Sequence, residues 1–251
     1  MGEIIATASQ KGGVGKTTTA VNLSASLAIL EKKVLLIDTD PQGSVGDSFG
    51  MDKYTIDYGM YEVLVKNVPI VDAIVETRLN GFDIVPANIW GEAEEIAFTQ
   101  KLENTQLLRS VLDVIKDDYD YIIIDCPPSL GTITINSIVS ADSVLIPIQC
   151  EYFALKALGR FLKMTREIKS KYNPSLSYRG FLLTMVDEKD SQTNAIINEL
   201  KRSLKDLVFK SYIPRDTKVS EAPAHGYPVA LLDVGTRGAV AYLELAKEII
   251  K

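Results

Sequence analysis

The feature that most constrains the fold is a glycine-rich segment between an apolar run and a long helical pattern. Residues 9–19 read Ser-Gln-Lys-Gly-Gly-Val-Gly-Lys-Thr-Thr-Thr and directly follow the apolar run 4–8. Glycines permit positive φ angles, so successive backbone N–H groups can face one anion. The helix that begins there adds unpaired N–H donors and partial positive charge. Strand, glycine-rich turn and helix in this order predict a phosphate-binding loop.

The side chains of this segment suggest separate roles at a bound nucleotide. Lys16 should reach the β- and γ-phosphates, the Thr17 hydroxyl should ligate Mg²⁺, and Thr18 should lie on the α-phosphate side. The segment departs from the G-x-x-x-x-G-K-[ST] pattern, because Gln10 stands where its first glycine would be and a second lysine, Lys11, comes next. A solvated glycine-rich turn is the alternative, and the agreement of strand, Gly-Lys-Thr and helix argues against it.

Short apolar runs and helical patterns alternate along the whole chain. Strands are expected at Ile4–Ala8, Val34–Asp38, Asp83–Val85, Tyr121–Asp125, Ser143–Ile148 and Gly180–Met185. Helices are expected at Thr17–Leu30, Thr105–Lys116, Leu155–Lys171, Thr193–Leu207 and Gly238–Ile250. This alternation predicts one α/β domain over residues 1–251, with a mostly parallel twisted sheet and helices on both faces, as in P-loop NTPases. Ligands in such folds bind at the carboxyl ends of the strands.

Two acidic segments fall at such carboxyl ends. Asp38 and Asp40 close the second expected strand, and Asp125 closes the run Tyr121–Asp125. Phosphoryl transfer needs a carboxylate near Mg²⁺ and a group that orients the attacking water. Asp125 suits the first role and Asp40 the second, so Thr17, Asp40 and Asp125 are the candidate metal ligands. An aspartate that only caps a loop or a helix is the alternative for each.

The charge of the chain is unevenly distributed. The net charge of −6 argues weakly against a nucleic-acid partner, yet residues 160–218 hold 13 Lys or Arg and 7 Asp or Glu. A basic segment on an acidic protein can still contact phosphate.

No apolar run reaches the roughly 18 residues of a membrane span. With two cysteines, Cys126 and Cys150, and no visible signal peptide, we expect a cytoplasmic protein.

Several segments together resemble the ParA/Soj chromosome- and plasmid-partitioning ATPases of the deviant Walker A superfamily. They read KGGVGKTT at 11–18, DTDPQG at 38–43, DCPPSLG at 125–131, QCEYFA at 149–154, IPR at 213–215 and SEAP at 220–223. They cover nearly the whole chain in the expected order, which makes the match specific.

The resemblance implies a slow, Mg²⁺-dependent ATPase that forms a sandwich dimer when ATP is bound. In that dimer Lys11 would cross to the partner's phosphates, as an arginine finger does, and Gly12 would lie at the contact. Lys11, Lys16 and Asp40 would be the catalytic residues. The implied ATP contacts are Lys11, Gly12, Gly13, Val14, Gly15, Lys16, Thr17, Thr18, Met185, Pro214 and Asp216.

The resemblance also implies partners. These are non-specific double-stranded DNA bound by the ATP dimer, and a ParB/Spo0J-type protein that stimulates hydrolysis, so the protein would be nucleoid-associated. The candidate DNA contacts are Lys201, Arg202, Lys205, Lys210, Arg215 and Lys218. The spacing of the first three places them on one helix face, although a solvated basic helix is the alternative.

Two departures from the family concern these finer features. The loop at 186–193 is longer than in close relatives and lacks an arginine, and Asp216 stands where an asparagine is usual. Both leave the phosphate loop unchanged, but they put the DNA affinity and the adenine contacts in question.

Three related functions compete with DNA partitioning. A MinD-like membrane-cycling ATPase would need a basic amphipathic C-terminal helix, whereas the helix expected at Gly238–Ile250 carries acids and should pack on the domain. A nitrogenase-type iron protein would need cysteines that ligate a cluster, whereas Cys126 and Cys150 look structural. Positioning of a protein cargo over the nucleoid uses the same ATPase cycle, so the sequence separates it poorly from DNA partitioning.

Overall fold

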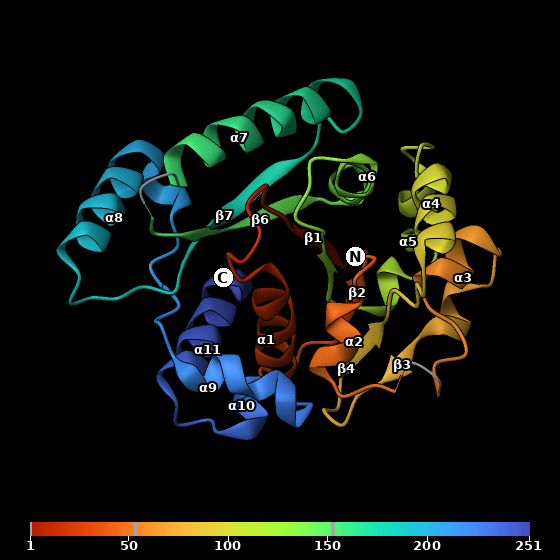
Figure 1. The fold of residues 1–251 in the computed structure, drawn as a ribbon, viewed down its shortest axis with the longest axis horizontal. Coiled ribbons are helices and arrows are strands. Elements are labelled where there is room, and N and C mark those ends of the chain that lie inside the picture. The colour runs from red at the N-terminus through yellow and green to blue at the C-terminus, as the bar shows by residue number, and fades with distance from the viewer. Residues whose placement is uncertain (1, 53–54, 152–153) are drawn as a thin grey trace.

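The computed structural model describes residues 2–52, 55–151 and 154–251. The expected α/β fold with its mostly parallel sheet is confirmed, and the strands follow the order β3-β4-β2-β5-β1-β6-β7. Within the described residues, β3 is antiparallel to β4 and the other pairings are parallel (Figure 1). The strands are β1 (Glu3–Thr7), β2 (Val34–Asp38), β3 (Val75–Glu76), β4 (Phe82–Val85), β5 (Tyr121–Asp125), β6 (Ser143–Gln149) and β7 (Ser177–Thr184).

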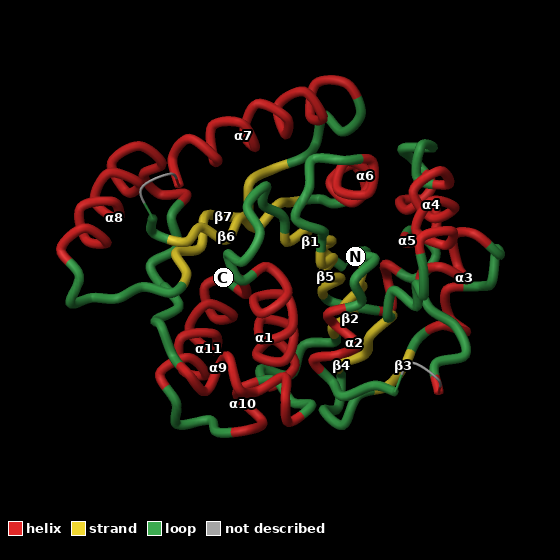
Figure 2. Tube along the Cα trace, viewed as in Figure 1, coloured by secondary structure: helices red, strands yellow, loops and turns green. Residues whose placement is uncertain are grey.

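Helices cover both faces of the sheet (Figures 1 and 2). One layer contains α1 (Lys16–Ile29), α2 (Ser44–Ser48), α9 (Thr217–Glu221), α10 (Val229–Leu232) and α11 (Arg237–Ile250). The other contains α3 (Met60–Val65), α4 (Glu92–Lys101), α5 (Leu107–Leu112), α6 (Thr132–Ser140), α7 (Ala154–Lys171) and α8 (Ser191–Leu204). Short 3₁₀ turns lie at Ile70–Ala73, Lys116–Asp118, Lys205–Leu207 and Ala222–His225.

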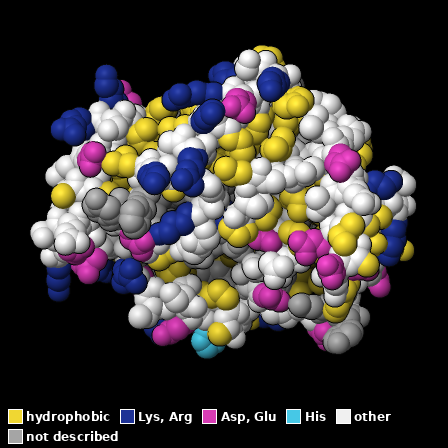
Figure 3. Space-filling model, turned by 45° about the horizontal axis from the view of Figure 1, so that its top comes forward, with side chains coloured by type: hydrophobic (Ala, Val, Ile, Leu, Met, Phe, Trp, Pro, Cys, Tyr) yellow, Lys and Arg dark blue, Asp and Glu magenta, His cyan; other side chains and the backbone are white. Residues whose placement is uncertain are grey.

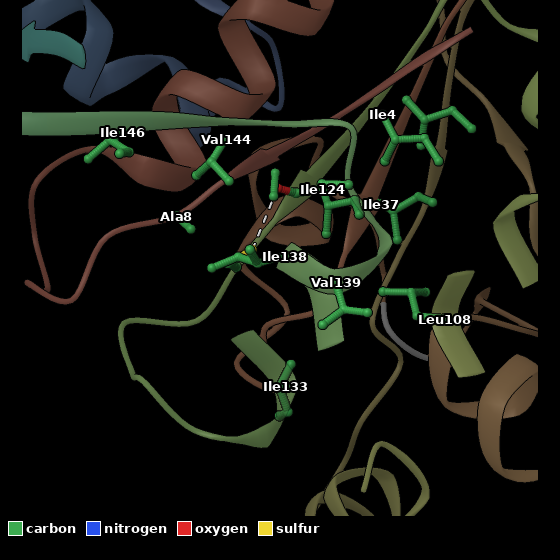
Figure 4. Close-up of a cluster of buried hydrophobic side chains, with 14 of the residues drawn as sticks. Ile4, Ala8, Ile37, Leu108, Ile124, Ile133, Ile138, Val139, Val144 and Ile146 are labelled. Carbon is green, nitrogen blue, oxygen red and sulfur yellow. Dashed lines mark hydrogen bonds between the residues drawn. The ribbon is translucent and has the colours of Figure 1, made fainter. Parts of the chain in front are cut away.

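Each central strand is buried on both faces, which explains its continuous apolar sequence. Successive side chains of a strand point to opposite faces. In β1, Ile4 therefore joins the core under α3–α8, whereas Ile5 joins the core under α1 and α11. Figure 4 shows part of the first of these cores, with isoleucines of the sheet on one side and Ile133 and Ile138 of α6 on the other.

The expected helix over Gly238–Ile250 is confirmed as α11, and it packs on the domain as expected. Tyr242, Leu245 and Ile249 are at most 1% exposed and lie against α1. Among the described residues, none of the helices combines the length and the apolarity that crossing a bilayer requires.

Candidate nucleotide site

The predicted phosphate loop lies between β1 and α1, at the carboxyl edge of the sheet. Gly13 and Gly15 have φ angles of +72° and +84°, which L side chains rarely adopt. Gly15 also serves as the N-cap of α1, so the unpaired N–H groups of the first helical turn begin at the loop. The backbone therefore has the conformation that presents N–H donors to an anion.

Lys16 is the first residue of α1 and is only 7% exposed. Its ammonium donates to the Lys11 carbonyl oxygen at 3.4 Å, across the mouth of the loop. Burial lowers the pKa of Lys16, while the nearby Asp125 and Asp40 act in the opposite direction. A buried cation with so little local pairing is poised to interact strongly with a phosphate.

Three strands end at the same level beside this loop. The register pairs Asp125 with Thr7 on one side and with Asp38 on the other. All three side chains are fully buried. The edge of the sheet therefore brings together the two acidic segments that the sequence placed at strand ends.

Asp125 has an environment that suits a metal ligand. Thr17 donates its hydroxyl to Asp125 Oδ2 at 2.6 Å, whereas Oδ1 is buried and has no partner among the described residues. Burial is the main reason that the pKa of Asp125 rises from 3.8 to about 7, with a further contribution from the Asp40 charge. A cation beside Oδ1 would relieve this electrostatic cost.

The residues at this edge fit a magnesium ion that is also held by phosphates. Within the described ranges, no three His, Cys, Asp or Glu side chains form a metal cage of their own. Mg²⁺ usually takes one or two carboxylates and completes its shell with water and substrate phosphates. Thr17 and the orphaned oxygen of Asp125 match that arrangement, and Asp40, only 8% exposed, lies on the adjacent loop.

Asp38 and Thr39 fix the loop that carries Asp40. Asp38 accepts hydrogen bonds from the N–H groups of Asp40 at 2.9 Å and of Val45 at 3.0 Å. Thr39 donates its hydroxyl to the Asp125 carbonyl at 2.7 Å. Burial raises the pKa of Asp38 well above its usual value, and the Asp125 charge adds to the effect. Asp38 therefore positions Asp40, a role that its place in the strand alone did not reveal.

Lys11 behaves differently from Lys16. Its ammonium forms an ion pair with Glu151 and donates to Gln149 Oε1 at 3.5 Å, so it is held by the loop after β6. Its side chain is 37% exposed. Tyr152 and Phe153, which belong to the segment that resembles the family, lie outside the described residues.

The three expected ATP contacts outside the phosphate loop, Met185, Pro214 and Asp216, come from two neighbouring segments. Met185 follows β7 with a φ of +52°, and its methyl group lies 3.8 Å from the position of a Cβ on Gly15. A bridge between Val186 and Pro214 holds the two segments together. Asp216, however, accepts from the N–H groups of Lys218 and Gly238, both at 2.9 Å. Its carboxylate thus caps α9 and ties it to α11.

A cavity of about 680 Å³ opens next to Met185. Its described lining includes Gln149, Glu151, Asp190 and Arg215, but neither Pro214 nor Asp216. The volume is typical of small-molecule sites.

Thr184 donates its hydroxyl to the Val14 carbonyl at 2.9 Å and so joins β7 to the phosphate loop. The two residues are 170 positions apart, so no local sequence pattern indicates this contact.

The six candidate DNA contacts are exposed, but the first three do not all share the expected helix face. Lys201 and Arg202 lie in the last turn of α8. The helix expected to reach Leu207 ends at Leu204, and Lys205 has a φ of +51°, so the shared-face prediction is wrong for Lys205. Lys218 is paired with Glu221 at 2.9 Å.

Comparisons with known proteins identify the family. The family model described as an AAA domain matches residues 2–178. The chain is 45% identical to the sporulation initiation inhibitor protein Soj of Bacillus subtilis, over 99% of this chain and 98% of that protein. It is 41% identical to the chromosome partitioning protein ParA of Caulobacter vibrioides, with 98% and 93% covered.

A solved structure agrees with this fold. Cobyrinic acid a,c-diamide synthase from Mycobacterium smegmatis, with a bound ATP analogue and magnesium, has a TM-score of 0.83 and 32% identity, over 98% of this chain and 93% of that one. Nucleotide and magnesium binding thus accompany the fold in this relative. By its matching domain and its relatives over nearly full length, the chain belongs to the ParA/Soj family of P-loop partitioning ATPases.

Proposed function

We propose that this chain is a DNA-partitioning ATPase that dimerises on binding ATP and Mg²⁺ and is reset by hydrolysis. The observation that carries the proposal is that two lysines of one loop have different surroundings. Lys16 is buried at its own phosphate loop, whereas Lys11 is held away from it by Glu151. A second protomer that presents a γ-phosphate would offer Lys11 a more highly charged partner than Glu151.

Each residue of the site has a separate role in hydrolysis. Lys16 binds the β- and γ-phosphates, while the phosphate loop orients them through its N–H groups. Asp40, held by Asp38, orients the attacking water towards the γ-phosphate and takes up its proton. Thr17 and Asp125 would hold Mg²⁺, and the bound ion would supply positive charge to the phosphate oxygens. Lys11 of the opposite protomer adds a cation to the same oxygens.

Gly12 offers a direct test of the sandwich dimer. A Cβ at Gly12 would first meet Pro128 Cβ at 3.8 Å, and the φ of Gly12 is not positive, so one protomer can accept valine. Gly12→Val should therefore bind ATP and remain a monomer, while Asp40→Ala should bind ATP, lose about 100-fold or more in turnover and accumulate as a dimer.

The measurement is light scattering coupled to size-exclusion chromatography, with ATP, ADP and no nucleotide. Gly12→Ala is the matched control, since a methyl group alone adds less bulk at the contact. Dimers of Gly12→Val at saturating ATP would contradict the sandwich arrangement. An Asp40→Ala protein that stays monomeric with ATP would contradict the role of Asp40.

The proposed cycle includes DNA and a ParB-type partner. Exposed cations at the end of α8 and near α9, chiefly Lys201, Arg202 and Arg215, support DNA binding because phosphate contacts need cations but no base-specific groups. Binding should require ATP, should be similar for unrelated duplexes and should weaken steeply with salt. Fluorescence anisotropy with ATP, ADP and no nucleotide tests this, and sequence-specific binding would contradict it.

Partner stimulation and location need separate measurements. A ParB/Spo0J-type protein should raise the ATPase rate of the DNA-bound dimer, and a fluorescent fusion should colocalise with the nucleoid. Colocalisation with a protein assembly instead, with no effect of a ParB-type protein, would favour the cargo-positioning alternative.

A further inference from the structure

We propose that the outer face of α7 is a second surface for the phosphate backbone of duplex DNA, separate from the cations near α8 and α9. We define this α7 basic face as Lys156, Gly159, Arg160, Lys163 and Arg166. The inference rests on the proposed DNA binding and assigns it an additional site.

The α7 basic face lies opposite the buried side of the helix. Leu158, Phe161 and Ile168 are at most 6% exposed and pack on the sheet. At 3.6 residues per turn, the spacings of three and four residues place the members of the basic face together on the other side. Its five residues are exposed. Figure 3 shows several Lys and Arg side chains gathered on one part of the surface.

The cations of this face form no ion pair within the described structure, and the nearest acid on α7 is Glu167, four residues after Lys163. Residues 154–166 contain four cations and no Asp or Glu, although the whole chain has 33 acids and 27 Lys or Arg. Eight ion pairs occur among the described residues, and none of them includes these four side chains. Like charges three or four residues apart destabilise a helix. A row of like charges that forms no ion pairs is therefore stabilised best by an external anion.

Gly159 adds an independent observation. It is an exposed residue in the middle of an 18-residue helix, where glycine is unfavourable. A Cβ built there would meet nothing within 4 Å, so internal packing does not require glycine. The missing side chain leaves a shallow place between the cations, which permits close approach of a sugar-phosphate chain.

The dimensions match a duplex strand. From Lys156 to Arg166 the helix rises about 15 Å, at about 1.5 Å per residue. One strand of B-DNA carries a phosphate for about every 3.4 Å of its axis. Because the strand also winds around that axis, its phosphates lie farther apart than this rise, and the four cations can contact a few neighbouring phosphates of one strand. The continuous row favours a polyanion of regular spacing over an acidic protein segment.

The test removes charge from one surface at a time. The α7 variant combines Lys156→Gln, Arg160→Gln and Lys163→Gln. The control combines Lys33→Gln, Lys247→Gln and Lys251→Gln, which removes the same charge from the α1–α11 layer. Binding of a fluorescent duplex of arbitrary sequence is measured at several salt concentrations, with a non-hydrolysable ATP analogue.

The α7 variant should bind at least about tenfold more weakly at low salt, and the slope of log K against log salt should fall by about 1 for each lost contact. Its dimerisation and its basal ATPase rate should match the unsubstituted chain. Gly159→Gln should weaken binding because it fills the shallow place, and Gly159→Glu should weaken it more because it adds negative charge to the same bulk. Both should retain the helix, as judged by circular dichroism.

The outcomes separate this inference from the function on which it rests. If the unsubstituted chain shows no ATP-dependent binding, both the proposed DNA binding and the α7 site are overturned. If it binds and the α7 variant binds with equal affinity and slope, the α7 site alone is overturned. An equal loss in the control variant would also overturn it, because the effect would then report net charge rather than a surface.

Discussion

Replacement of Asp125 by asparagine should stabilise the metal-free protein at neutral to alkaline pH while it removes a metal ligand. The pKa of Asp125 rises from 3.8 to about 7 in the folded protein, mainly through burial. Between these values the folded state binds more protons than the unfolded state. The contribution of this group to stability is therefore present below pH 3.8 and is lost as the pH rises through 7.

The magnitude follows from the shift of about 3 units. Each unit corresponds to about 1.4 kcal/mol, so ionised Asp125 costs the folded state about 4 kcal/mol at pH 8. Asparagine stays neutral at every pH and can still accept the hydrogen bond that Thr17 donates to Asp125. Asp125→Asn should therefore exceed the unsubstituted protein in unfolding free energy by about 4 kcal/mol at pH 8, and by much less at pH 5.

Urea unfolding at pH 5, 6.5 and 8, with EDTA and without nucleotide, measures this difference. Asp117→Asn is the matched control, because Asp117 is exposed and its replacement should show no such pH dependence. An Asp125→Asn protein that is no more stable than the unsubstituted protein at pH 8, or a difference that is the same at all three pH values, would contradict a destabilising charge on buried Asp125. With ATP and Mg²⁺ present, the variant should lose turnover.

Three further outcomes follow from the structure. Lys16→Ala should weaken ATP binding by at least about 100-fold, measured by calorimetry, because a charged hydrogen bond to phosphate is lost in a buried site; near-normal affinity would remove the basis of the phosphate-site assignment. Lys11→Ala should keep ATP affinity within about threefold and lose most ATPase activity, as steady-state kinetics would show; unchanged turnover would exclude Lys11 as the cation supplied to the partner. Gly180→Ala should lower the free energy of unfolding by about 1–3 kcal/mol, because its Cβ would lie 2.5 Å from the Phe209 ring. The control Gly159→Ala should raise the free energy of unfolding by about 0.5–1 kcal/mol, because alanine favours a helix over glycine. Equal effects of the two variants in chemical unfolding would show that contact with the Phe209 ring does not exclude a side chain at residue 180.

The candidate site at the carboxyl edge of the sheet could be predicted because each of its parts has a local sequence signature. The glycine-rich segment follows β1, Asp38 and Asp125 end β2 and β5, and a parallel sheet brings such strand ends together. The hydrogen bonds that Asp38 accepts and the pairing of Lys11 with Glu151 have no such signature. They depend on the register of strands and on loops that are distant in sequence.

Some elements were missed for physical reasons. Residues 132–140 read Thr-Ile-Thr-Ile-Asn-Ser-Ile-Val-Ser and favour a strand by composition, because β-branched residues are poor helix formers. They form α6 because packing against the sheet outweighs this preference. β3 has only two residues, which is too short for any periodicity. The expected helix over Thr105–Lys116 contains α5 from Leu107 to Leu112 and ends in a 3₁₀ turn.

The packing of α11 against α1 has a consequence for synthesis of the protein. Asn22 of α1 accepts from the Val229 N–H at 2.7 Å, and Thr19 lies 3.4 Å from the Tyr242 hydroxyl, although more than 200 residues separate each pair. The helix that follows the phosphate loop therefore cannot complete its packing while the chain beyond residue 229 is still within the ribosome. ATP binding should begin only late in translation, so an incomplete chain cannot join the ATPase cycle.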